Sequence, residues 1–99
     1  MNNERRKALK VLRNQIDEIH RALSNFDIDE IKAGVEEHRD DEQSYYDNMP
    51  ESFQDGDKGQ AAQDAIEQLD GAIEALESLE EMLQNLENAV GCIETACGD

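Results

Sequence analysis

The C-terminal part of the chain carries its most regular hydrophobic pattern. Apolar or cysteine residues recur every seven positions in two interleaved series. One series is Ala62, Leu69, Leu76, Leu83, Val90 and Cys97, and the other is Ala65, Ala72, Leu79, Leu86 and Ile93. This is the a/d pattern of a helix that packs along its length against a partner helix. The pattern predicts one long helix over residues 58–97.

The N-terminal part predicts a helix over residues 4–25, followed by a kink or a short break. Its apolar residues are spaced by three and four, and they are Leu9, Leu12, Ile16, Ile19, Leu23 and Phe26. The register slips after Phe26, where Ser24 and Asn25 can end the helix. Asp27 with Glu30 resembles a capping box for the next helix.

A second helix is expected over residues 28–48. Its apolar series contains Ile28, Ile31, Val35, His38, Tyr45 and Met49. Pro50 ends it, because the residue before a proline is pushed out of helical geometry. The predicted fold is therefore one all-α domain, residues 1–99, built as a long antiparallel hairpin with a kinked or broken first arm. The alternative is a three-helix bundle whose last helix bends near Gly71.

The charge balance narrows the possible functions. The 99 residues include 25 acidic and 9 basic side chains, for a formal net charge of −16. Six of the bases lie in the first predicted helix. Such a chain disfavours direct binding to nucleic acid and favours a basic protein partner, although the charge could also serve solubility alone. With neither a membrane-length apolar run nor a secretory leader, we expect a cytoplasmic protein.

Candidate partner-binding residues form acidic stripes on two predicted helices. Carboxylates at a spacing of three and four follow one another about 5 Å apart along a helix axis, which roughly matches a lattice of phosphates about 3.4 Å apart. The stripes comprise Glu67, Asp70, Glu74, Glu77 and Glu81 on the last helix, and Glu36, Glu37, Asp40 and Asp41 on the second. The alternative is an ordinary solvated helix surface.

The connection around Pro50 holds three of the four aromatic residues. We expect Tyr45, Met49 and Phe53 to pack at the tip of the hairpin. Tyr46, together with Phe53, could instead offer an aromatic anchor to a partner. Apolar residues beside the main series of the last helix suggest self-association into a dimer or higher oligomer, and these are Ile66, Ile73 and Met82.

No catalytic residue, metal ligand or cofactor site is predicted. His38 with Asp41 and Glu42 could bind a divalent ion, but an interior His38 is the favoured interpretation, while His20 is expected to face solvent. Cys92 and Cys97 are five residues apart on one helix, so they point in different directions and should remain reduced thiols.

The stretch from Tyr45 to Gly59 (YYDNMPESFQDGDKG) resembles small acidic helical proteins encoded by phages and prophages. The resemblance implies a phage accessory protein that binds and blocks a host factor in the host cytoplasm. Together with the charge, it predicts a non-enzymatic inhibitor that blocks a basic nucleic-acid-binding or defence protein through a DNA-like acidic surface. The alternative is a structural coiled-coil scaffold that self-associates, with its charge serving solubility.

Overall fold

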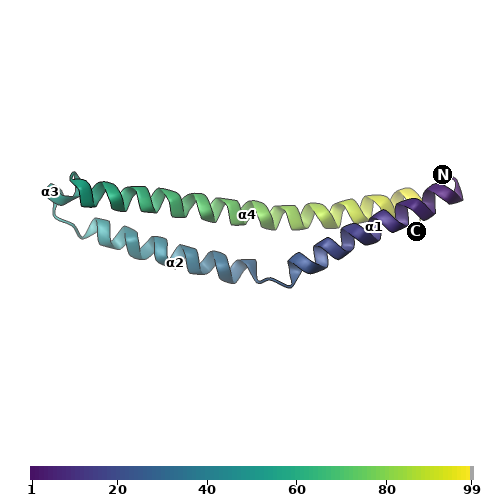
Figure 1. The fold of residues 1–99 in the computed structure, drawn as a ribbon, viewed down its shortest axis with the longest axis horizontal. Helices are drawn as coiled ribbons and strands as arrows, with labels where there is room; N and C mark the ends of the chain where they lie inside the picture. The colour runs from purple at the N-terminus through teal and green to yellow at the C-terminus, as the bar shows by residue number, and fades with distance from the viewer. Residues whose placement is uncertain (99) are drawn as a thin grey trace. The chain divides into compact units, whose positions relative to one another are not determined.

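The structure is a computed structural model that describes residues 1–98, in which four helices and no strand are present. The helices are α1 (Asn3–Ser24), α2 (Ile28–Asp47), α3 (Glu51–Gln54) and α4 (Asp57–Cys97), as Figure 1 shows. The all-α prediction is confirmed, and the three long helices begin and end within one residue of the predicted ranges. The sequence pattern did not predict α3, which is a single turn.

The helix ends are fixed by local hydrogen bonds. The side chain of Asn2 caps α1 by accepting a hydrogen bond from the Arg5 backbone N–H at 2.8 Å. The predicted end of α1 is confirmed at Ser24, whose hydroxyl donates to the carbonyl oxygen of His20. At the other end of the chain, Gly98 follows α4 with a φ of 77°, the left-handed conformation that commonly stops a helix.

The chain packs as two compact units that share α4. Unit 1 comprises Met1–Asp27 and Leu79–Asp99, and unit 2 is Ile28–Ser78. In unit 1, α1 therefore packs against the C-terminal part of α4. In unit 2, α2 and α3 pack against the N-terminal part of α4. The alternative with a last helix bent near Gly71 was wrong, because α4 is uninterrupted from Asp57 to Cys97. In each unit, a helix of the predicted first arm packs against a part of α4.

Polar contacts show that both helix pairs are antiparallel. In unit 1, Arg13 lies 3.5 Å from Glu94, and His20 lies 3.0 Å from Glu87. A step of seven residues forward on α1 is therefore a step of seven backward on α4. Seven residues equal two helical turns, so the contacts recur along one line of each helix.

In unit 2, the contacts show that α2 turns a different set of residues toward α4 than predicted. Its half-buried positions step by three and four from the buried Ile28, and they are Lys32, Val35, Arg39, Glu42 and Tyr46. Three positions of the predicted series are exposed instead, namely Ile31 at 51%, His38 and Tyr45 at 52%. The prediction of an interior His38 was therefore wrong, because Arg39 and Tyr46 form the polar contacts with α4.

The apolar series of α1 is only half used within unit 1. Leu9, Ile16 and Leu23 are half-buried, whereas Leu12, Ile19 and Phe26 are 50%, 52% and 66% exposed. Leu12 and Ile19 lie about 100° around the helix from Arg13 and His20, which contact α4, so these two side chains point outward.

The fully buried apolar set is small. Among the described residues it consists of Ile28, Ala62, Ile73 and Cys97. Most of the long a/d series of α4 is half-buried, as expected for a seam covered by one helix. Ala72 departs from the prediction, since it is exposed while its neighbour Ile73 occupies the interior.

The one-turn helix α3 packs closely onto the first turn of α4. Gly59 is buried there, and a Cβ atom at this position would overlap the backbone of Gln54. Only glycine lets two backbones approach this closely without a shift. Gly56 precedes α4 and its carbonyl accepts the hydrogen bond of the Gln60 backbone N–H, so Gly56 takes the N-cap position of α4.

Candidate functional site

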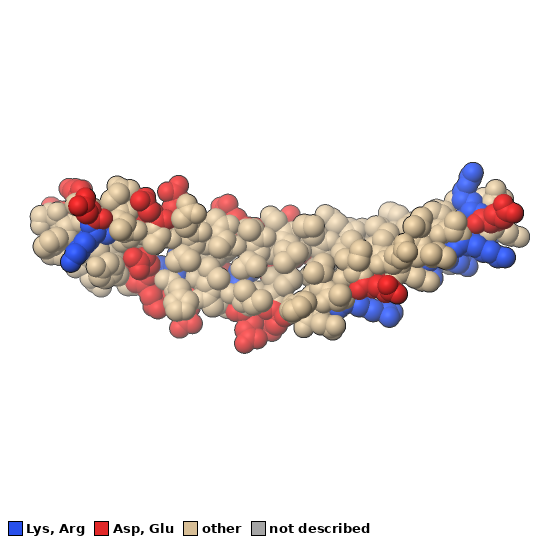
Figure 2. All heavy atoms as spheres, viewed as in Figure 1, with Lys and Arg blue, Asp and Glu red and all other residues tan. Residues whose placement is uncertain are grey.

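The charge is distributed unevenly between the two units. The sequence of unit 2 holds sixteen acidic and three basic residues, a formal net charge of −13. The two segments of unit 1 hold nine acidic and six basic residues, a formal net charge of −3. Figure 2 shows acidic side chains over α2 and the start of α4, and basic side chains near the N-terminus. The acidic surface that the sequence predicted therefore belongs chiefly to unit 2.

The most defined feature of this acidic surface is a groove between α2 and α4. Its hollow has a volume of about 270 Å³ and is lined by Gln43, Tyr46, Gln63, Ile66, Glu67 and Asp70. The antiparallel pairing of α2 and α4 creates it, because the polar side chains of each helix meet along the seam. We call this feature the acidic groove and include the carboxylates that flank it on the same side.

Arg39 bridges the two helices beside the groove. Its guanidinium donates a hydrogen bond to Asp70 of α4 at 3.0 Å and two to Asp40 of α2, at 3.0 and 3.1 Å. The bond to Asp70, and then the bond to Asp40, raise the pKa of the Arg39 side chain above its ordinary value. Arg39 is therefore a permanent cation that partly neutralises two of the predicted binding residues, Asp40 and Asp70.

The other predicted acids divide between the groove and the outer surface. Glu67 lines the groove, and Glu74 and Glu77 follow Asp70 by four and seven residues, so all three lie along its side of α4. Glu36 precedes Arg39 by three residues and is half-buried on the same side of α2. These acids are the members of the predicted stripes that lie beside the groove.

Glu37 and Asp41 do not join this set. Each is two residues from Arg39, which is about 200° around the helix, so their exposed side chains point away from α4. Glu81 is exposed as well, but it belongs to the part of α4 in unit 1. Six of the nine predicted acids therefore lie beside the acidic groove, and Glu37, Asp41 and Glu81 do not.

Tyr45 and Tyr46 exchange the places that we expected for them. Tyr46 is half-buried, its hydroxyl accepts a hydrogen bond from the Gln63 side chain at 2.6 Å, and its carbonyl accepts one from Gln54 at 3.0 Å. Tyr45 and Phe53 are 52% and 54% exposed. The predicted closed tip was therefore wrong for these two, which instead edge a small hollow of about 160 Å³ together with Met49 and Lys58.

The residues predicted for self-association are not all available. Ile73 is only 6% exposed and packs inside unit 2, so it cannot form an outer surface. Ile66 is half-buried in the floor of the acidic groove. Met82, which is 58% exposed in unit 1, does lie on the surface.

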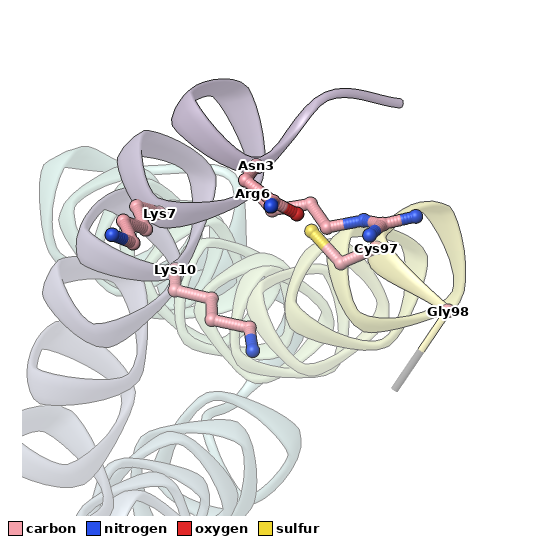
Figure 3. Close-up of a pocket in the computed structure, with 6 residues that line it drawn as sticks. All are labelled: Asn3, Arg6, Lys7, Lys10, Cys97 and Gly98. Carbon is pink, nitrogen blue, oxygen red and sulfur yellow. The ribbon is translucent and has the colours of Figure 1, made fainter.

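A contrasting pocket of about 430 Å³ lies in unit 1 and is basic. It is lined by Asn3, Arg6, Lys7, Lys10, Cys97 and Gly98. Figure 3 shows the Arg6 side chain extending from α1 past Cys97 over the end of α4, and both residues line this pocket. The C-terminal end of α4 carries a partial negative charge, and the cations of the pocket stabilise this helix end by interacting with it.

The histidines and cysteines offer no further site in the described part of the chain. His20 was expected to face solvent, but its side chain is only 22% exposed and contacts Glu87. Cys92 is exposed and Cys97 is buried, and both are free thiols. Within residues 1–98, no group of three or more His, Cys, Asp or Glu side chains could hold a metal ion.

No helix formed by residues 1–98 combines the length and the apolar character that crossing a bilayer requires. Comparison with family models, curated proteins and solved structures found no match.

Proposed function

We propose that the chain is a non-enzymatic binding protein that engages a basic, nucleic-acid-binding partner through the acidic groove of unit 2. The observation that carries the proposal is the concentration of a formal charge of −13 in unit 2, against −3 in unit 1. A charge needed only for solubility has no reason to gather in one unit. Complementary charge of this density favours rapid association with a basic surface.

The groove adds shape to the charge. Two helices present parallel rows of carboxylates, with Glu36 and Asp40 on one side and Glu67, Glu74 and Glu77 on the other. Such rows resemble the two phosphate strands that border a groove of nucleic acid. Tyr46 and Gln43 lie between the rows and offer polar groups to an inserted basic side chain. Occupation of a partner's nucleic-acid-binding surface would inhibit that partner, as the resemblance to phage accessory proteins suggests.

The test compares two charge-reversal variants of equal net charge. The groove variant is Glu67→Lys, Glu74→Lys and Glu77→Lys. The control variant is Glu37→Lys, Asp41→Lys and Asp55→Lys, which are exposed positions outside the groove. Each variant and the unchanged chain serve as bait for basic proteins from a bacterial lysate at low and high salt. Recovered proteins are then tested for displacement of labelled double-stranded DNA.

We expect the unchanged chain and the control variant to capture a DNA-binding protein and displace its DNA at low salt. The groove variant should fail in both assays while retaining its helical circular dichroism, and high salt should weaken capture. Equal loss in both triple variants would show that net charge alone acts. Full capture by the groove variant would refute the proposed groove.

A further inference from the structure

Unit 1 exposes a row of large apolar side chains that its own two helices leave uncovered. Leu12 and Ile19 are each at least half exposed and lie seven residues apart, so they form one line along α1. Phe26, which is 66% exposed, follows just after the end of this helix. Val11 beside them is 58% exposed. The only fully buried apolar side chain among the described residues of unit 1 is Cys97. A helix pair with so little interior needs further burial to be stable.

The α4 helix adds to the same side of unit 1. On α1, Leu12 and Ile19 each come one residue before a residue that contacts α4, which is a rotation of about 100° around the helix. On α4, Met82 comes five residues before the contact residue Glu87, which is a rotation of about 140° in the same sense. Because α1 and α4 are antiparallel, these rotations bring Met82, 58% exposed, to the side of Leu12 and Ile19. We call this side of unit 1 the apolar face.

We propose that the apolar face docks on the same face of a second copy of the chain, forming a four-helix homodimer. A heptad-spaced apolar row is the surface that helices use to pack against each other. Two antiparallel helix pairs that share their exposed rows would form a bundle with a common interior. The dimer would leave the acidic groove of unit 2 outside the contact, so each assembly would offer two grooves.

The size of the apolar face suits a dimer. A helix of 22 residues such as α1 is about 33 Å long, and two adjacent helices are about 20 Å wide. Each copy would contribute roughly 650 Å², for about 1,300 Å² in total, which lies within the range of stable protein interfaces.

Charge decides which unit of the chain a second copy can approach. Two copies meeting through unit 2 would bring together formal charges of −13, whereas contact through unit 1 brings together only −3. Unit 2 has its own exposed apolar row, Ile31 and Tyr45, but it lies on the strongly acidic unit. The apolar row of unit 1 is therefore the one that a second copy can approach.

The experiment measures the mass of the full chain by sedimentation equilibrium. The interface variant is Leu12→Gln, Ile19→Gln and Phe26→Gln, and the matched control is Ile31→Gln and Tyr45→Gln. We expect the unchanged chain and the control to have twice the chain mass of 11.2 kDa, and the interface variant to have a single chain mass. The dimer should persist in 1 M NaCl, which separates it from the salt-sensitive binding proposed for the groove.

A second measurement needs no substitution. The melting temperature of a dimer rises with protein concentration, so the unchanged chain should melt at a higher temperature when concentrated one hundredfold. A monomeric mass with a concentration-independent melting temperature would overturn the proposal. So would an interface variant that remains dimeric, or a control variant that becomes monomeric.

Discussion

A guanidinium nitrogen of Arg39 on α2 lies 3.0 Å from a carboxylate oxygen of Asp70 on α4, and the next polar contact lies seven residues away on each helix. Seven residues further along α2, Tyr46 accepts a hydrogen bond from Gln63, which is seven residues earlier on α4. Arg13 with Glu94 and His20 with Glu87 repeat this interval in unit 1. The polar pairs therefore mark the register and the rotation of both helix pairs, and the apolar rows lie beside them.

The contribution of Arg39 should be independent of pH over the neutral and alkaline range. Its pKa is raised in the folded protein, so the stability it provides is complete below the pKa of the unfolded chain and is lost only as the pH rises through the folded value. Both values lie far above neutral pH. Arg39→Met should therefore lower the melting temperature by the same amount at about pH 7 and at about pH 10.

Lys58→Met is the matched control for this experiment, because it removes an exposed cation from the same unit. It changes the net charge equally without breaking a pair to Asp70. A loss at Arg39 that disappears by pH 10, or a loss at Lys58 of the same size, would show that general charge repulsion and not the Arg39 pairing is responsible.

The sequence predicted the helices well because their limits depend on local signals. The Ser24–Asn25 pair at the end of α1 and the proline at position 50 act within one helical turn. The rotation of α2 was not predictable in this way. Its two candidate rows, with Ile31 and Tyr45 on one and Val35 and Tyr46 on the other, are similarly apolar. The choice between them depends on Asp70 and Gln63, which are distant in the sequence.

The acidic groove was predictable in composition but not in shape. Spacing along α4 correctly grouped Glu67, Glu74 and Glu77 on one side of the helix. It could not show that Arg39 would neutralise part of Asp70, because that contact crosses 31 residues of sequence. The rotation of α2 decides which of its side chains face α4, so Tyr46 turns inward while Glu37 and Asp41 lie on the outer surface.

Gly59 should be the least replaceable glycine in the described chain. Gly59→Ala would place a Cβ atom against the backbone of Gln54, and such overpacking costs about 1–3 kcal/mol of unfolding free energy. Gly71→Ala is the control, since a Cβ there meets nothing within 4 Å. It should stabilise the helix by about 0.5–1 kcal/mol. Urea unfolding would give both values, and a stabilised Gly59→Ala variant would refute the close packing of α3.

Two adjacent tyrosines should differ in their contribution to stability. Tyr46→Phe removes the acceptor of the 2.6 Å hydrogen bond from Gln63, which should cost about 0.5–1.5 kcal/mol. Tyr45→Phe alters only a half-exposed side chain and should be close to neutral. The same unfolding experiment compares them. If Tyr45→Phe proved the more destabilising, the rotation of α2 described above would be wrong.

The two thiols should react at clearly different rates, although they lie on the same final turns of α4. Cys92 is exposed, whereas Cys97 is 4% exposed and lies beside the Arg6 side chain (Figure 3). A buried thiol reacts only when local opening uncovers it, so Cys97 should be alkylated about tenfold or more slowly than Cys92. Mass spectrometry of iodoacetamide-treated protein would resolve the two sites.

Single variants assign the rates and test their cause. Cys92→Ser should leave only the slow reaction, and Cys97→Ser only the fast one. Arg6→Ala should accelerate alkylation of Cys97, because it removes the side chain that extends past Cys97 over the end of α4, and should leave Cys92 unchanged. Lys7→Ala is the matched control, since Lys7 is an exposed cation of the same helix turn. Equal rates at both cysteines in the unchanged chain would mean that the end of α4 does not pack on α1, and this would also remove the basic pocket.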